Sequence, residues 1–232
     1  TYDRIECTAD ELPSLDGSLG PEWVGLSVTM PGKFAALEFA GERTERAQLV
    51  GSANTLVRTA SGWRADNTDI DGVTGALGRR GGLRRAIVLG AGGTAPAAVV
   101  ALAELDVSTL TIAARDPAKA ARLVELGSRL GLSSEFTDLG DPGLAETAAR
   151  ADVVVSTIPA DAAAGYARIF AGVPVLLDAI YDPWPTPLAE AVAAAGGEVI
   201  SGLQMLLHQA FSQVEQFTGR PAPRQQMVTA LQ

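Results

Sequence analysis

The sequence predicts an α/β protein of two domains, the second of them a Rossmann-type, doubly wound parallel sheet. From Arg85 onward, short apolar runs alternate regularly with helix-length segments, which is typical of such sheets. A glycine-rich phrase at Gly90–Ala95 (G-A-G-G-T-A) directly follows one of these runs and opens a helix. The 232 residues, 47% of them hydrophobic, suffice for one large domain or two modest ones.

The first third of the chain differs because it is mixed and rich in turns. Short apolar or alternating stretches predict strands, and a proline at the start of a segment favours a helix. The expected elements are strands at Tyr2–Cys7, Trp23–Val28, Ala53–Arg58 and Trp63–Asn67, a helix beginning near Pro31 and a helix at Asp69–Leu77. We predict an α/β domain over residues 1–72, on which the C-terminal helices of residues 203–232 pack.

The rest of the chain supplies the regular alternation. A continuous apolar run such as Ala86–Leu89 is typical of a strand buried on both faces. The expected strands are Ala86–Leu89, Thr109–Ala113, Val153–Ser156, Val175–Leu177 and Val199–Ile200, and the expected helices are Ala95–Leu105, Pro117–Leu130, Pro187–Ala195, Leu203–Phe217 and Pro223–Leu231. Residues 73–202 are therefore predicted to form the cofactor domain.

Charge and cysteine content restrict the partners and the compartment. The formal net charge is −9, from 18 basic and 27 acidic residues without a basic run, so nucleic acid and anionic membranes are poor candidates. Cys7 is the only cysteine, which fits a reducing compartment. With no long apolar stretch and no signal peptide at its first residues, the chain is expected to be cytoplasmic. No metal-ligand cluster is evident, and the only histidine, His208, is expected on an outward helix face.

The glycine-rich phrase predicts a dinucleotide-binding turn. Gly90 permits a tight turn, Gly92 lets the backbone approach a pyrophosphate, and Ala95 takes the small position where helix meets strand. Amide groups at the helix start and the positive end of the helix macrodipole favour phosphate there. The expected cofactor contacts in this turn are Gly90, Ala91, Gly92, Gly93, Thr94 and Ala95.

The end of the next strand, Ala114-Arg115-Asp116, bears on the choice between NAD and NADP. An acidic residue at this strand tip accepts a hydrogen bond from a ribose 2′-hydroxyl and favours NAD. Arg115 can instead stack on adenine and hold a 2′-phosphate, and Lys119 adds charge one turn later. We therefore hypothesise NADP. Asp116 either caps the following helix or repels that phosphate.

Lys33 and Asp69 are the candidates for proton chemistry. They follow apolar, strand-like runs, in V-T-M-P-G-K and N-T-D-I-D-G. Hydride transfer to a carbonyl needs a proton donor at the oxygen, and a carboxylate can orient a lysine ammonium and maintain its charge. Taken alone, a lysine after Pro-Gly is more often a surface turn residue, and Asp69 can be a helix N-cap.

Six phrases, taken together and in order, resemble the shikimate dehydrogenase family. Its members carry N-V-T-x-P-x-K, G-A-x-N-T, N-T-D-x-x-G, a G-A-G-G loop, Tyr-x-P-x-x-T-P-L and G-x-x-M-L-x-x-Q. The matching segments are Ser27–Lys33, Gly51–Thr55, Asn67–Gly72, Gly90–Gly93, Tyr181–Leu188 and Gly202–Gln209. The resemblance implies that residues 1–72 are the substrate-binding domain. The family's leading strand–loop–helix unit, with its Ser-x-Ser motif for the substrate carboxylate, has no counterpart in this sequence, so this domain is expected to be incomplete.

The resemblance implies a role for each matching residue. Lys33 and Asp69 correspond to the family's catalytic pair. The implied substrate contacts are Thr29, Asn54, Tyr181 and Gln209, and the implied cofactor contacts, beyond the glycine-rich turn and Ala114, Arg115 and Lys119, are Thr157, Gly202 and Met205.

The implied reaction is the NADP-dependent interconversion of 3-dehydroshikimate and shikimate, a step toward aromatic amino acids. Two alternatives stay open: a quinate or dual-specificity dehydrogenase of the same fold, and a non-catalytic NADP-binding homologue. The expected partner is a small-molecule substrate, without metal, nucleic acid or membrane, and a homodimer is one option for the assembly.

Overall fold

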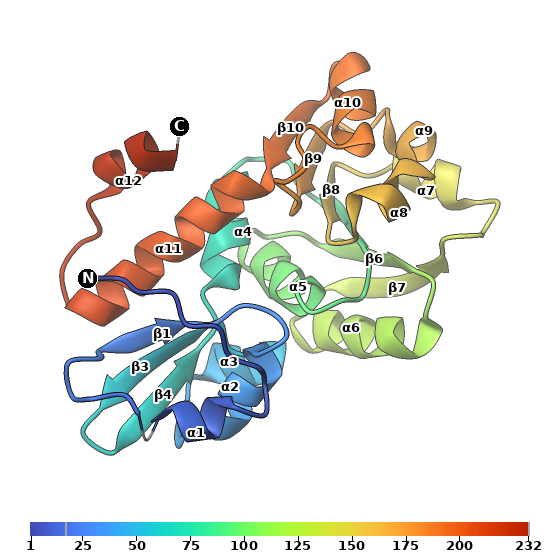
Figure 1. Cartoon of the computed structure of the whole chain (residues 1–232). Helices are drawn as coiled ribbons and strands as arrows, with labels where there is room; N and C mark the ends of the chain where they lie inside the picture. Colours follow the sequence, from blue (N-terminus) through green and yellow to red (C-terminus); the bar gives the residue numbers. More distant parts are fainter. Residues whose placement is uncertain (17, 232) are drawn as a thin grey trace. The chain divides into compact units, whose positions relative to one another are not determined.

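The computed structural model describes residues 1–16 and 18–231 (Figure 1). The chain divides into two compact units, of which unit 1 comprises residues 1–68 and 210–224 and unit 2 comprises residues 69–209 and 225–232. The chain passes from one unit to the other at Thr68–Asp69, again within one long helix, α11 (Gly202–Thr218), and a third time at Arg224–Gln225. The domain bounds expected from the sequence stay a prediction, and the division observed here falls a few residues before residue 72.

Unit 1 contains a small mixed sheet with the strand order β1-β3-β4-β2. Its strands are β1 (Gly25–Ser27), β2 (Glu42–Arg43), β3 (Thr55–Thr59) and β4 (Gly62–Asp66), and its helices are α1 (Leu12–Asp16), α2 (Lys33–Phe39) and α3 (Glu45–Val50). β3 and β4 form an antiparallel hairpin, and its turn ends at Gly62, whose φ of 131° suits glycine. Leu12, Ala36, Leu56 and Trp63 form the core of this unit.

Unit 2 is built on a six-stranded parallel sheet with the order β10-β9-β8-β5-β6-β7. The strands are β5 (Arg85–Leu89), β6 (Thr109–Ala114), β7 (Ser133–Asp138), β8 (Val153–Ser156), β9 (Val175–Asp178) and β10 (Glu198–Ser201). β5 pairs with β6 on one side and with β8 on the other, so the order of strands reverses at β5. Ligands of such sheets bind at the carboxyl ends of the strands beside this reversal.

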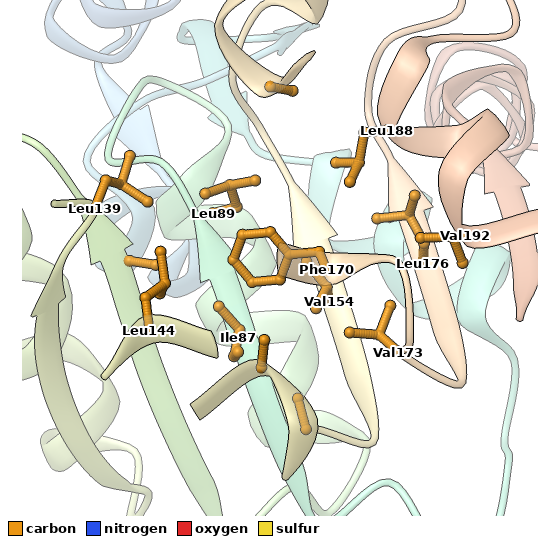
Figure 2. Packing of buried hydrophobic residues seen from close by; sticks show 14 of the residues in the cluster. Ile87, Leu89, Leu139, Leu144, Val154, Phe170, Val173, Leu176, Leu188 and Val192 are labelled. Carbon is orange, nitrogen blue, oxygen red and sulfur yellow. The ribbon is translucent and has the colours of Figure 1, made fainter. Parts of the chain in front are cut away.

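Two groups of helices accompany the sheet (Figure 1). The helices are α4 (Asp69–Leu77), α5 (Ala95–Glu104) and α6 (Pro117–Arg129) in one group, and α7 (Leu144–Ala149), α8 (Ala160–Ala164), α9 (Ala167–Phe170) and α10 (Pro187–Ala194) in the other. Figure 2 shows the ring of Phe170 among Ile87, Leu89, Val154 and Leu176 on the side of the second group. The chain ends in α12 (Arg224–Leu231), and no helix among the described residues is long and apolar enough to cross a bilayer.

The predicted fold class is confirmed, but the strand predicted at Tyr2–Cys7 is wrong. The elements α1, β2, α3, β7, α7, α8 and α9 were not predicted. Residues 2–7 belong to neither sheet, and Tyr2 is 77% exposed, so the apolar alternation there has no buried face behind it. β7 was not predicted because its sequence, S-S-E-F-T-D, is mostly polar, as suits an exposed edge strand. α3 was also not predicted; Thr44 caps its start and Gly51, at a φ of 74°, ends it.

Candidate active site

The turn between β5 and α5 has the geometry expected of a dinucleotide site. Gly90 adopts a φ of 108°, and a Cβ there would lie 2.5 Å from Ile158 Cγ2 and 2.7 Å from Thr157 Oγ1. Gly92 faces open space among the described atoms. Thr94 precedes α5 without a side-chain capping hydrogen bond, and Ala95 is buried where the helix meets the sheet. The positive end of α5 is therefore presented at an exposed glycine turn.

Two charged residues that bear on cofactor choice, Arg115 and Asp116, follow β6 and have different surroundings. Asp116 caps α6, because its Oδ1 accepts hydrogen bonds from the amides of Ala118 (3.0 Å) and Lys119 (3.2 Å). Lys119 Nζ lies 3.8 Å from Asp116 Oδ2. Arg115 is exposed and makes no hydrogen bond or ion pair within the described part of the chain. Asp116 thus has the capping role, and Arg115 is available to an anionic ligand, next to the buried Ala114.

Thr157 and Gly202 lie at two other strand ends of the same sheet. Thr157 follows β8, and its Oγ1 donates to the carbonyl oxygen of Leu89, at 3.0 Å, immediately before Gly90. Gly202 begins α11 after β10, and a Cβ there would overlap the carbonyl oxygen of Ala179. The structure therefore brings Thr157 to the glycine turn and places the start of α11 against the backbone that follows β9.

Met205, His208 and Gln209 lie on α11. A Cβ on Gly72 of α4 would lie 2.7 Å from the carbonyl oxygen of the buried Met205, so the two helices pack closely through glycine. The expectation that His208 faces outward is wrong: it is half-buried, and its ring lies where a Cβ on Gly75 would be. Gln209 is half-buried, and its Nε2 donates to the carbonyl of Leu206.

Asn54 is the centre of a buried polar cluster in unit 1. Its Oδ1 accepts from the amide of Thr68 and from Thr55 Oγ1, both at 2.8 Å, and its Nδ2 donates to Thr68 Oγ1 at 3.0 Å. Gln213 of α11 donates through Nε2 to the carbonyl of Asn54 and to Thr55 Oγ1, both at 3.0 Å. Hydrogen bonds therefore join the G-S-A-N-T and N-T-D phrases, which are separate in the sequence.

The V-T-M-P-G-K phrase joins the same cluster through its backbone. The amide of Val28 donates to the carbonyl of Asn54 (2.8 Å), and the amide of Ala53 donates to the carbonyl of Lys33 (2.9 Å). Lys33 is the first residue of α2 and is half-buried, whereas Thr29 is exposed in the preceding turn. Asp69, which follows Thr68 directly, is buried in the first turn of α4, where the macrodipole stabilises a carboxylate.

An ion pair between the buried Asp66 and the half-buried Arg46 lies beside the N-T-D phrase. Arg46 Nε donates to Asp66 Oδ1 (2.7 Å) and Arg46 NH2 to Oδ2 (2.5 Å), while Thr44 Oγ1 and Gln216 Nε2 donate to the same carboxylate. Burial raises the pKa of Asp66, but these hydrogen bonds and the Arg46 charge outweigh it and lower the pKa to about 2. The strand end that leads into Asn67 is therefore fixed to α3 and α11.

Several residues of this cluster were not found from the sequence. Thr68, Gln213 and Asp66 carry the hydrogen bonds that hold the motifs, yet none was predicted as a site residue. Gln213 follows Gln209 by four residues, so both lie on one side of the helix. This spacing could have indicated Gln213 as a site residue. Asp66 directly precedes the N-T-D phrase, which could have drawn attention to it, but only the structure shows that it is buried.

The remaining predicted substrate residue, Tyr181, lies in the segment between β9 and α10 with 47% of its surface exposed. Among the described residues no group of three or more histidine, cysteine, aspartate or glutamate side chains is arranged to hold a metal. The fold and these residues together define a two-unit α/β enzyme of the nicotinamide-dependent oxidoreductase class.

Comparison with known proteins identifies the family within that class. Residues 1–56 match the shikimate dehydrogenase substrate binding domain, and residues 202–232 match the shikimate 5′-dehydrogenase C-terminal domain. A shikimate dehydrogenase (NADP(+)) from Anaeromyxobacter dehalogenans is 35% identical, over 94% of this chain and 80% of its own length. This chain belongs to the shikimate dehydrogenase family.

Solved structures agree with this assignment. The crystal structure of Mycobacterium tuberculosis shikimate dehydrogenase matches with a TM-score of 0.96 and 69% identity, covering 99% of this chain and 86% of that one. The shikimate 5-dehydrogenase of Thermus thermophilus, determined in complex with NADP(H) and shikimate, matches with a TM-score of 0.78 and 27% identity, over 96% of this chain and 83% of its own.

Proposed function

We propose that this protein catalyses the reversible, NADP-dependent reduction of 3-dehydroshikimate to shikimate. The observation that carries the proposal is the Asn54 cluster, which joins the Lys33 phrase to the N-T-D phrase in unit 1, together with an intact nucleotide turn in unit 2. The relative from Thermus thermophilus was solved with NADP(H) and shikimate, which supports the same pair of ligands here.

The residues present fit NADP. The positive φ of Gly90, the exposed turn at Gly92 and the uncapped start of α5 suit a pyrophosphate, and the available Arg115 suits a 2′-phosphate. The residues proposed to hold the cofactor are Gly90, Ala91, Gly92, Gly93, Thr94, Ala95, Ala114, Arg115, Lys119, Thr157, Gly202 and Met205. When bound in its reduced form, the cofactor supplies the hydride.

The chain's own residues handle the substrate and the proton. In the direction of reduction, the Lys33 ammonium donates a proton to the oxygen of the ring carbonyl, and in the reverse direction the neutral amine accepts it. Lys33 and Asp69 are proposed as the catalytic pair, as the resemblance to the family implies. Thr29, Asn54, Tyr181 and Gln209 are the proposed substrate contacts. The hydrogen bonds with Thr55 and Thr68 hold the Asn54 amide in one orientation, which favours selective binding of a substrate hydroxyl.

The reaction is tested by following NADPH absorbance with shikimate and with quinate, each with NADP and with NAD. We expect shikimate-dependent reduction of NADP, with a higher kcat/KM for shikimate than for quinate. Equal values for the two substrates would favour the dual-specificity alternative. A folded protein that binds NADP but turns over neither substrate would contradict the enzymatic role and favour the non-catalytic alternative.

Cofactor choice is tested at Arg115. The Arg115→Met variant is expected to lower the kcat/KM ratio of NADP over NAD by roughly 10- to 100-fold, because hydrogen bonds to a charged group contribute about 1.5–3 kcal/mol. The matched control is Arg150→Met, since Arg150 is also exposed but stands before the amino end of β8 rather than after the carboxyl end of β6. An unchanged ratio in Arg115→Met would mean that this guanidinium does not bind the 2′-phosphate.

Three further proposals concern organisation. Unit 1, together with the match of residues 1–56 to a substrate binding domain, supports residues 1–72 as the substrate domain. The single cysteine supports a cytoplasmic location. A homodimer is proposed as the assembly, and sedimentation velocity of the purified protein distinguishes it from a monomer.

A further inference from the structure

Asp178 is a buried carboxylate to which the reaction assigns no part. It ends β9 and is fully buried, in register with Ser156 of β8. Its Oδ1 accepts a hydrogen bond from the amide of Ile180 (3.2 Å), and its Oδ2 accepts one from Thr186 Oγ1 (2.7 Å). Burial raises the pKa of Asp178, and the bonds from Thr186 and Ile180 partly offset this rise. Burying a carboxyl group costs free energy unless its oxygens are hydrogen-bonded, so both of these bonds stabilise the buried Asp178.

These two hydrogen bonds connect the two ends of the loop 179–186. Ile180 stands at its beginning and Thr186 at its end, so one carboxyl group ties together the two ends of the loop. Thr186 is also fully buried and caps α10, because its Oγ1 accepts from the amide of Ala189 at 3.1 Å. The loop end is therefore fixed to both β9 and α10 through a single hydroxyl.

The beginning of the loop has further backbone anchors. The amide of Ala179 donates to the carbonyl of Ser156 (2.9 Å), and the amide of Gly202 donates to the carbonyl of Ile180 (3.3 Å). Because Gly202 has no side chain, the start of α11 can lie directly on the carbonyl of Ala179. The backbone of residues 179 and 180 is therefore held by Ser156 of β8, by the Asp178 carboxylate and by the start of α11.

The residues between the anchors are much less buried. Tyr181 is 47% exposed and Trp184 is 39% exposed. Large side chains with this exposure are not fixed by a surrounding core, so the conformation of the loop backbone decides where they lie.

We propose that Asp178 and Thr186 are positioning residues for substrate binding, which act by holding the loop 179–186 so that Tyr181 is presented in one conformation. The inference rests on the proposed function, in which Tyr181 contacts the substrate. Both side chains are fully buried, so the proposal assigns them an action through the loop and no direct contact with a ligand.

The test compares Thr186→Val, which removes the hydroxyl at nearly constant volume, with Thr186→Ser, which keeps it. In Thr186→Val we expect the KM for shikimate to rise about 5-fold, the equivalent of one hydrogen bond, while the KM for NADP stays within about 2-fold. Thr186→Ser should keep both values close to those of the unsubstituted protein. A purely structural role would lower the Tm of Thr186→Val without a selective change in the KM for shikimate, and that result would overturn the proposal.

A double-mutant cycle with Tyr181→Ala shows whether the effect acts through Tyr181. If it does, Thr186→Val should change the KM for shikimate less than about 2-fold when Tyr181 is already alanine. Full additivity would overturn the proposal. If Tyr181→Ala alone leaves that KM unchanged, the substrate contact assigned to Tyr181 in the proposed function is wrong, and the positioning proposal falls with it.

Hydrogen exchange provides a readout that does not depend on turnover. The amides of Ile180, Tyr181, Asp182 and Trp184 should exchange about 5-fold faster in Thr186→Val than in Thr186→Ser, because the loop loses one of its two closing bonds. Asp178→Asn is the second variant: its amide offers one acceptor oxygen in place of two, so the same amides should also exchange faster. Unchanged exchange in both Thr186→Val and Asp178→Asn would overturn the proposal even if the protein proved not to act on shikimate.

Discussion

Replacing Lys33 with alanine is expected to lower kcat for shikimate oxidation by roughly 10²- to 10⁴-fold, the usual contribution of a positioned general acid or base. The dissociation constant of NADP should change little, because Lys33 is proposed to act on the substrate and is not among the residues proposed to hold the cofactor. Steady-state kinetics and NADP titration of the same preparation measure both quantities.

Two companion variants make this result specific. Lys33→Arg keeps a positive charge, but a guanidinium does not give up its proton near neutral pH, so activity should not return. Lys119, the other lysine of the sequence, serves as the contrast: Lys119→Ala should raise the KM for NADP and leave kcat nearly unchanged. A kcat within about 3-fold of the unsubstituted value in Lys33→Ala would exclude Lys33 as the proton donor.

The largest effect on stability is expected from Arg46→Met, which should lower the free energy of unfolding by about 2 kcal/mol, since the partly exposed Arg46 is screened by solvent. Methionine keeps an apolar stem but leaves the buried Asp66 carboxylate without its bidentate partner. The control is Arg150→Met, which breaks the exposed pair between Arg150 and Glu146 and should cost less than about 0.5 kcal/mol. Denaturant unfolding measures both, and equal losses would contradict the importance assigned to the pair between Arg46 and Asp66.

The contribution of Asp66 should depend on pH in a defined direction. Its pKa is lowered in the folded protein from 3.8 to about 2, so the stabilisation is fully present above pH 3.8 and is lost as the pH falls through about 2. By linkage this shift corresponds to about 2 kcal/mol at most, before solvent screening reduces it. The stability deficit of Arg46→Met should therefore shrink across that interval. A deficit that stayed constant down to pH 2 would show that the ionised Asp66 is not its source.

Unit 2 could be predicted well because its signals are local. A strand buried on both faces, such as Ala86–Leu89, reads as an unbroken apolar run, and the glycine turn follows it immediately. The strand β7 was not predicted, and its position in the sheet explains why. As an edge strand it is paired on one side only and largely exposed, so its residues need not be apolar.

The strand expected at Tyr2–Cys7 failed for the opposite reason. Alternation of apolar and polar residues predicts a strand only where one face is buried, and residues 2–7 pair with neither described sheet. His208 is similar: polarity suggested an outward face, but Gly75 on the neighbouring helix leaves room for the ring.

The sequence by itself determined the α/β class, the nucleotide turn, the family and the identity of the candidate residues, because each is encoded by periodicity or by short phrases of fixed spacing. Only the tertiary structure decided how those phrases are held: Asn54 against Thr68, Arg46 against Asp66, and Asp178 against Thr186. These pairs join residues that are separated along the chain, and a single sequence contains no signal for which polar groups become buried together. Burial makes an unpaired polar group costly, so it is the fold that fixes the partners and thereby the geometry of the site.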